Sequence, residues 1–133
     1  MHFELKLPLL GFESITQMKL TKIDDIFMQL ENDTDDTKTS FTLINPFVLK
    51  PYEIDIPTSI QALLEITETS NVLIFNIVVI HKPLNKSTIN FLAPFIFNTD
   101  NNTMAQTILD GKAAQNHGMA ETIGDFLNKN KND

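Results

Sequence analysis

Short apolar runs rich in Ile, Val, Phe and Thr are the feature that most limits what this chain can fold into. The runs NVLIFNIVVI at 71–80 and TINFLAPFIFN at 88–98 are interrupted or bounded by Pro, Asn and Asp. Runs of this composition and length are typical of β-strands, because β-branched and aromatic side chains pack well on a pleated surface. By the same pattern we expect strands at 18–23, 40–49 and 52–56.

Two segments favour helices instead. In PTSIQALLEI at 57–66, Thr58 and Gln61 have the spacing of a capping box, and the apolar residues share one helical face. Near the C-terminus, the apolar residues of ETIGDFL at 121–127 also recur at helical spacing. The segment IDDIFMQL at 23–30 fits both patterns, so the sequence leaves strand and helix open there.

Together these elements predict an all-β fold. Six or so short strands around one core imply a small barrel or sandwich, because uncovered sheet edges would invite aggregation. We therefore expect a single-domain, β-barrel-like fold with one or two short helices. A chain of 133 residues suits one domain, which we place at 1–127. The Lys-, Asn- and Asp-rich residues 128–133 are predicted to form a disordered tail.

The residues that usually carry chemistry are scarce. There is no Cys, which excludes disulfides, cysteine nucleophiles and thiolate metal sites, and His2, His81 and His117 show no paired-ligand spacing. We find no GxSxG, HExxH or Gly-rich phosphate loop, so we expect no catalytic residue, no metal and no cofactor. Glu53 and Asp55 alternate with isoleucines, as on the wet face of a half-buried strand.

The charge balance narrows the class of partner. Seventeen acidic residues against ten basic ones give a net charge of −7, which opposes nucleic-acid binding and favours a basic partner protein or simple solubility. The stretch 24–36 holds six acids without Lys or Arg and fits a solvated loop or a docking surface. The N-terminus lacks a signal-peptide pattern, and no apolar run approaches the roughly 20 residues that span a bilayer. We therefore expect a cytoplasmic protein without membrane contact.

The stretch STINFLAPFIFNTDNNTMAQTIL at 87–109 predicts a hairpin with a turn through NTDNN. Pro94 cannot donate to a ladder, so the strand is expected to bulge or to lie at an edge there, with nearby main-chain groups left free. Asn90, Asn98 and Gln106 then have two interpretations. They satisfy main-chain groups at the bulge and the turn, or they contact a partner.

The same stretch resembles the signature of the flagellar assembly factor FliW family. It has a Thr/Asn strand, an A-P pair, an apolar run that ends in Asn, a variable turn and a Q-x-I/L return. The resemblance spans 9–109 and departs from the family pattern at 31–36 and after Asp110. Four further matching pieces follow in the family's order: LLGFE at 9–13, NPF at 45–47, YEIDIP at 52–57 and NVLIFNIVVI at 71–80.

The resemblance implies a non-enzymatic cytoplasmic binding protein. Members of this family bind newly made flagellin and also the RNA-binding translational regulator CsrA, and they relieve CsrA repression of flagellin synthesis by partner exchange. We pair the acidic residues with the basic regulator and the hairpin with flagellin. The predicted partner-binding residues are Asp24, Asp25, Asn45, Glu53, Asp55, Asn90, Pro94, Asn98 and Gln106.

A different class of function stays open at this point. A small β-barrel of this kind could bind a small ligand or carry carboxylate-based hydrolase chemistry. A defined polar pocket lined by Asn90, Asn98 and Gln106 would favour that alternative, whereas a flatter surface would favour protein binding.

Overall fold

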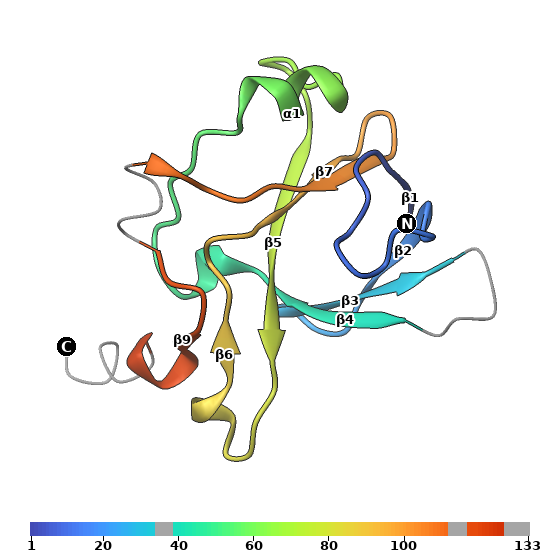
Figure 1. Cartoon of the computed structure of the whole chain (residues 1–133). Coiled ribbons are helices and arrows are strands. Elements are labelled where there is room, and N and C mark those ends of the chain that lie inside the picture. Colours follow the sequence, from blue (N-terminus) through green and yellow to red (C-terminus); the bar gives the residue numbers. More distant parts are fainter. Residues whose placement is uncertain (34–38, 112–116, 127–133) are drawn as a thin grey trace.

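Nine strands are found in the part of the chain that the computed structural model describes, which is residues 1–33, 39–111 and 117–126. Seven of them form one closed ring of strands (Figure 1). In chain order these seven are β1 (His2–Leu5), β2 (Gln17–Lys22), β3 (Phe27–Asn32), β4 (Ser40–Ile44), β5 (Val72–Val79), β7 (Phe95–Asn98) and β8 (Thr103–Gln106).

Two pairings close the ring. β1 lies parallel to β8, with Glu4 opposite Thr103, and β4 lies antiparallel to β5, with Leu43 opposite Ile77. The other neighbours in the order β4-β3-β2-β1-β8-β7-β5 are antiparallel. Closure pairs both sides of these strands, which removes the edges that a small open sheet would expose. The predicted all-β, barrel-like fold is confirmed.

The remaining two strands extend β5 beyond the barrel. β6 (Thr88–Ile89) pairs with the end of β5, and β9 (Glu121–Thr122) pairs with β6. The C-terminal residues 117–126 therefore lie against this extension, and residues 123–126 are helical as expected. The predicted tail at 128–133 lies outside the described residues.

Side-chain alternation divides the interior into separate clusters. Along β7, Phe95 and Phe97 point into the barrel core, whereas Ile96 points outward and packs under α1 (Thr58–Leu63). A further cluster, which we call the second cluster, lies outside the barrel around Tyr52, Phe91 and Phe126. β7 is buried on both faces because helix, barrel and second cluster surround it.

Several of the strand boundaries expected from the sequence are wrong. The strand expected at 40–49 stops at Ile44, since Asn45 caps a 3₁₀ helix, η1 (Pro46–Val48). The run 88–98 is two strands, β6 and β7, separated by residues 90–94. Residues 52–56 form no strand, although their burial still alternates. Proline and the tertiary packing interrupt ladders that composition alone would continue.

The helix at 58–63 is confirmed, but its capping box is wrong. The N-cap is Pro57, and no side chain caps the helix there. Gln61 instead donates from Nε2 to the carbonyl oxygen of Ile56 at 2.7 Å. The segment 23–30 that the sequence left open becomes a turn followed by β3, because its apolar residues pair with β2 and β4.

Candidate functional site

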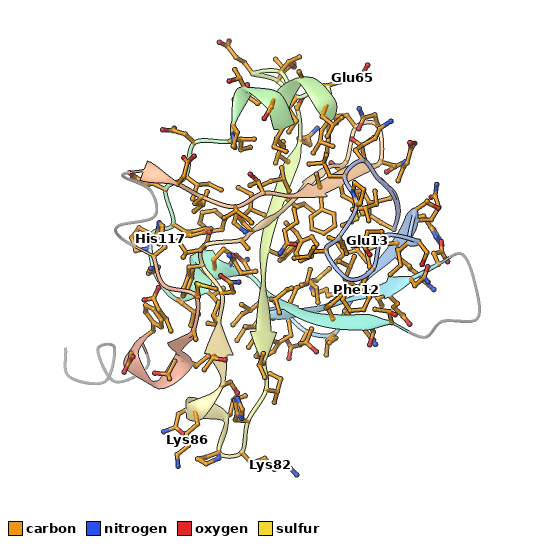
Figure 2. The ribbon with its side chains drawn as sticks, in the orientation of Figure 1. Phe12, Glu13, Glu65, Lys82, Lys86 and His117 are labelled. Atoms are coloured by element: carbon orange, nitrogen blue, oxygen red, sulfur yellow. The ribbon has the colours of Figure 1, made fainter. Side chains whose placement is uncertain are left out.

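A recess lies at the end of the barrel where β1 and β8 finish and where β4 and β7 begin. We call it the mouth pocket. Its volume is about 150 Å³. The loop at 6–16 crosses this end, and Figure 2 shows Phe12 and Glu13 of that loop in front of the barrel strands. The lining includes Leu9, Leu10 and Phe12 from the loop, and Phe41, Phe95 and Gln106 from the strands.

The loop is held by a tight turn. Gly11 has a φ of +85°, which glycine adopts without steric cost. Its N–H donates to Oε1 of Glu13 at 3.1 Å, and the N–H of Phe12 donates to the carbonyl of Leu9 at 2.9 Å. The pKa of Glu13 is lowered, mainly by the hydrogen bond from Gly11. The ring of Phe12 then packs edge-on against Phe41 with centroids 5.5 Å apart.

Gln106 is the predicted site residue that reaches the mouth pocket. It occupies the side of β8 that also carries the buried barrel residue Met104, one step further toward the mouth. Its Nε2 donates to the carbonyl oxygen of Ala93 at 3.1 Å. Gln106 therefore fits both interpretations from the sequence, since it satisfies a main-chain group and also lines an open recess.

The segment 90–94 corrects the expected strand edge. Pro94 is buried, and β7 lies between β5 and β8, so this part of the hairpin is not an edge. Most of its main-chain groups are occupied rather than free. The N–H groups of Asn90, Phe91 and Leu92 donate to Ile77 O, Gly118 O and Asn90 Oδ1, and the carbonyls of residues 90–94 accept from Asn76, Tyr52, Leu109, Gln106 and Thr107.

Asn98 is also committed to the fold. Its side chain is 1% exposed; Nδ2 donates to the carbonyl of Leu64 at 2.9 Å, and Oδ1 accepts from the N–H of Asp100 at 3.0 Å. These bonds tie the β7–β8 turn to the end of α1. Partner contact through Asn98 stays a prediction, but in this arrangement its polar atoms already have partners.

A second recess, which we call the turn groove, lies beside the turn between β2 and β3. It is almost wholly apolar and has a volume of about 140 Å³. Its walls come from the turn, from β4 and η1, from the 3₁₀ helix η2 (Leu84–Lys86) and from the C-terminal segment. The lining includes Ile26, Ile44, Val48, Leu84 and Ile123.

Three predicted site residues gather at the turn groove. Oδ1 of Asp24 accepts from the N–H groups of Ile26 and Phe27, each at 2.8 Å, and these bonds lower the pKa of Asp24. Asp25 points into solvent and pairs with Lys22 at 3.1 Å. Asn45 adjoins the same turn, because its N–H donates to the carbonyl of Ile26 at 3.0 Å.

Glu53 and Asp55 lie apart from both recesses. Their side chains are exposed on the extended segment between η1 and α1. Tyr52 and Ile54 point the other way into the second cluster, and Ile56 packs against the apolar residues under α1, which include Ile60 and Ile96. Exposed and buried side chains therefore alternate as expected. The described segment 52–56 does not, however, form the strand that we expected there.

Sequence reasoning missed a buried polar cluster beneath these carboxylates. Nδ2 of Asn76 donates to the Tyr52 hydroxyl at 3.1 Å and to the carbonyl of Asn90 at 3.0 Å, and the hydroxyl donates to the carbonyl of Phe91. Burial is the main cause that raises the pKa of Tyr52. Oδ1 of Asn76 is buried without a hydrogen-bond partner among the described residues.

Lys50 connects this cluster to the C-terminal segment. Its Nζ lies 3.1 Å from Nδ1 of His117, 3.6 Å from Oε2 of Glu121 and 4.1 Å from the ring centroid of Phe91. The pKa of His117 is lowered, first by burial and then by the charge of Lys50. The sequence showed only that a Lys, a His and a Glu are present. Their meeting at one place depends on the fold, so no pattern in the sequence indicated it.

Within 1–33, 39–111 and 117–126, no three His, Asp or Glu side chains gather as potential ligands. In the same part of the chain, no helix combines the length and the apolarity needed to cross a membrane. The mouth pocket and the turn groove are two candidate sites among the described residues.

Comparison with known proteins agrees with this architecture. The protein family described as FliW protein matches residues 1–119. Flagellar assembly factor FliW 2 of Wolinella succinogenes is 51% identical over 128 residues, which cover 96% of this chain and 93% of that protein. Flagellar assembly factor FliW of Sulfurimonas denitrificans is 47% identical over 129 residues, or 97% of this chain and all of that protein.

A solved structure gives the same result at the level of the fold. The crystal structure of a flagellar assembly factor FliW is similar to this chain with a TM-score of 0.82 at 25% sequence identity. The match covers 92% of this chain and 84% of the other. The shared family profile, the near-full-length relatives and the shared barrel lead to one conclusion: this chain belongs to the FliW family.

Proposed function

We propose that this chain is a non-enzymatic, cytoplasmic flagellar assembly factor that binds flagellin and the translational regulator CsrA. When flagellin is scarce, the free protein binds CsrA and so relieves its repression of flagellin synthesis. When flagellin accumulates, it takes the place of CsrA. The observation that carries this proposal is the family match over residues 1–119.

The surface is consistent with protein partners. Two apolar recesses lie at different places on the fold, and each has carboxylates close by in the chain. Protein interfaces commonly centre on an apolar recess that receives one or two anchoring side chains and is surrounded by a polar rim. Two separate recesses offer a physical basis for two partners.

We assign CsrA to the side of the acidic turn. Asp24 and Asp25 border the turn groove, Asn45 is hydrogen-bonded to the same turn, and Glu53 and Asp55 add exposed negative charge. Negative potential of this kind attracts a basic partner and raises its association rate. Asp24 also shapes the turn, so its charge and its structural role have to be separated experimentally.

The small-ligand and hydrolase alternative has weaker support. Asn90, Asn98 and Gln106 do not share a pocket, since only Gln106 lines one. Both recesses are smaller than the roughly 300 to 1,000 Å³ that ligand sites commonly occupy. Glu53 and Asp55 are solvent-exposed and line neither recess, so they do not face an enclosed site.

Capture from a cell lysate tests the function. The tagged protein should retain flagellin and CsrA, identified by mass spectrometry, and purified flagellin should release CsrA from the bead-bound protein. An unrelated acidic protein of similar net charge is the control for unspecific capture of basic proteins. Retention of neither partner above that control would contradict the proposal, and release of a chemically altered small molecule would favour the alternative.

A further inference from the structure

The turn groove is surrounded by apolar side chains that reach solvent. Ile26 of the β2–β3 turn is 41% exposed, Val48 of η1 is 44% exposed and Leu84 of η2 is 48% exposed, and all three line the recess. Exposed apolar side chains are unremarkable when they are scattered singly, whereas a group of them around one recess indicates a surface that another molecule covers.

The wall of the groove that the β2–β3 turn forms is negatively charged. Asp24 and Asp25 directly precede Ile26 in the chain, and Oδ1 of Asp24 accepts from the N–H groups of Ile26 and Phe27, which both line the recess. Lys22 pairs with Asp25 at 3.1 Å, so the turn carries two negative charges against one positive charge. Positive charge on an occupant is therefore favoured at this wall.

The wall that η2 forms has the opposite charge. Lys82 and Lys86 flank Leu84 in the chain, both are exposed, and Figure 2 shows them at the tip of the connection between β5 and β6. The C-terminal segment beside η2 adds one exposed carboxylate, Asp125. Two positive charges thus stand against one negative charge here, although the chain as a whole has a net charge of −7.

This pair of oppositely charged walls decides which occupant fits. A uniformly basic protein gains at the turn but is repelled by Lys82 and Lys86, and a uniformly acidic protein meets the reverse problem at Asp24 and Asp25. A second copy of this chain avoids both. A two-fold contact presents the same surface twice, so the turn of each copy faces the η2 wall of the other, and the exposed apolar side chains of both copies meet between them.

We propose that the turn groove is the centre of a two-fold interface between two copies of this chain, which we call the groove dimer. The exposed apolar residues that line the groove form its centre. Asp24 and Asp25 of each copy face Lys82 and Lys86 of the other copy. An apolar centre with a charged rim is the usual composition of a protein interface.

The groove dimer has a consequence for CsrA, and this consequence rests on the function proposed above. CsrA was assigned to the side of the acidic turn, and each copy in the dimer covers Asp24 and Asp25 of the other. Self-association and CsrA binding therefore compete for the same surface. By mass action, the concentration of the protein then sets how much of that surface is free.

Sedimentation equilibrium over a range of concentrations tests the dimer. A salt concentration of about 0.15 M, where the Debye length is about 8 Å, screens the long-range repulsion between two chains of net charge −7. The wild type should show a monomer–dimer equilibrium, and Leu84→Ala should weaken dimerisation at least about tenfold while the melting temperature falls by only a few degrees. Ile108→Ala, which removes a 76% exposed side chain that lines neither recess, is the matched control and should dimerise normally.

Charge reversals test the reciprocal pairing. Asp25→Lys and the double variant Lys82→Glu/Lys86→Glu should each dimerise several-fold more weakly than the wild type, because like charges then face each other at both contacts. An equal mixture of the two variants should regain nearly wild-type affinity, since every negative wall again faces a positive one. Glu68→Lys has the same net charge as Asp25→Lys but lies beyond α1, so its mixture with the double variant should not regain affinity.

The outcomes separate the dimer from the proposed function. A wild type that stays monomeric at its highest soluble concentration, or a dimer that Leu84→Ala and the charge reversals leave unchanged, would overturn the groove dimer without affecting the proposed function. A monomeric wild type whose binding to another protein is weakened by Leu84→Ala would assign the groove to that protein and also refute the dimer. Dissociation of the dimer by added CsrA would support the shared surface, and CsrA binding to the intact dimer would contradict it. Absence of CsrA binding by the wild type would contradict the proposed function, whereas sedimentation alone decides on the dimer.

Discussion

The mouth pocket and the turn groove have similar volumes but are supported in different ways. The mouth pocket lies against the barrel core, whose strands are held by continuous ladders around a closed ring. The turn groove lies against the second cluster, where Ile123 of the C-terminal segment supplies one wall. That segment is attached through the two-residue pairing of β6 with β9, through main-chain bonds such as Phe91 N–H to Gly118 O, and through side-chain contacts. The comparison teaches that one recess is built by the sheet itself, whereas the other depends on a segment that can open locally.

Phenylalanine truncation should give the largest effects and distinguish the two supports. Phe95→Ala in the barrel core and Phe91→Ala in the second cluster should each lower the free energy of unfolding by about 3–5 kcal/mol, because both side chains are fully buried. Denaturant titration measures this loss. Hydrogen exchange then locates it: Phe91→Ala should deprotect residues 117–126, since Phe91 packs on Phe126 and its N–H bonds to Gly118, whereas Phe95→Ala should not. Equal deprotection in both variants would remove the distinction.

Two polar residues of the hairpin, Asn98 and Gln106, should differ in how much they contribute to stability and to binding. Asn98→Ala leaves the Asp100 N–H without its acceptor and removes one of three donors to the Leu64 carbonyl, so we expect a loss of about 1–3 kcal/mol of stability. Gln106→Ala removes one bond from a half-buried position and should cost about 0.5–1.5 kcal/mol. Flagellin affinity, measured by calorimetry below the melting range, should fall for Gln106→Ala and stay normal for Asn98→Ala. The opposite pattern would restore Asn98 as the contact residue.

Acid should weaken the turn groove before it affects the mouth pocket. Burial and the Lys50 charge lower the pKa of His117 in the folded state, with Glu121 opposing. The unfolded chain therefore binds a proton more readily, from its ordinary pKa of about 6.5 downward, and stability falls as pH drops from there through the lowered folded pKa. Protonation also places a second positive charge beside Lys50 and Tyr52.

Hydrogen exchange between pH 7.5 and 5.5 measures this effect. After correction for the intrinsic rate, protection of residues 117–126 should decrease with acid, while protection of β7 and β8 should not. His117→Gln should remove the decrease but retain His2 and His81 as internal controls. A decrease that persists in His117→Gln would assign the pH dependence to another group.

The smallest effect should come from surface charge. Asp25 is the best probe, because its side chain is 96% exposed and pairs with Lys22, whereas Asp24 also holds the turn. Asp25→Lys should slow CsrA association by a few-fold at low salt and leave dissociation nearly unchanged. Glu68→Lys, an exposed charge reversal beyond α1, is the control. Association that ignores both Asp25→Lys and added salt would rule out steering from the turn.

Local pattern predicted much of the secondary structure but not where the chain stops pairing. The run at 71–80 became β5 and the run at 18–23 became β2, because uninterrupted β-branched residues favour strands wherever a partner is available. The runs that contain or precede proline were overextended. Pro94 was correctly expected to interrupt the ladder, but the interruption is buried and its main-chain groups are satisfied by residues as distant as Tyr52 and Gly118.

The candidate site was predicted less completely than the fold. Asp24, Asp25 and Asn45 were selected separately and proved to lie at one turn, and Gln106 was selected and lines the mouth pocket. Leu10 was passed over, although the motif LLG already placed two leucines before a glycine turn. Nothing in the sequence indicates which leucine of such a pair is buried, because that depends on the barrel end beneath the loop.

The sequence by itself determined an all-β chain without cysteine chemistry, with an acidic surface and with the residue pattern of the FliW family. These properties are local or compositional, so they require no knowledge of which segments meet. Only the tertiary structure decided that seven strands close into a ring, that Asn98 is buried against the end of α1 while Ile108 is exposed, and that His117 meets Lys50. The physical reason is that closure, side-chain direction and charge pairing depend on contacts between residues far apart in the chain, whose free energies no local pattern contains.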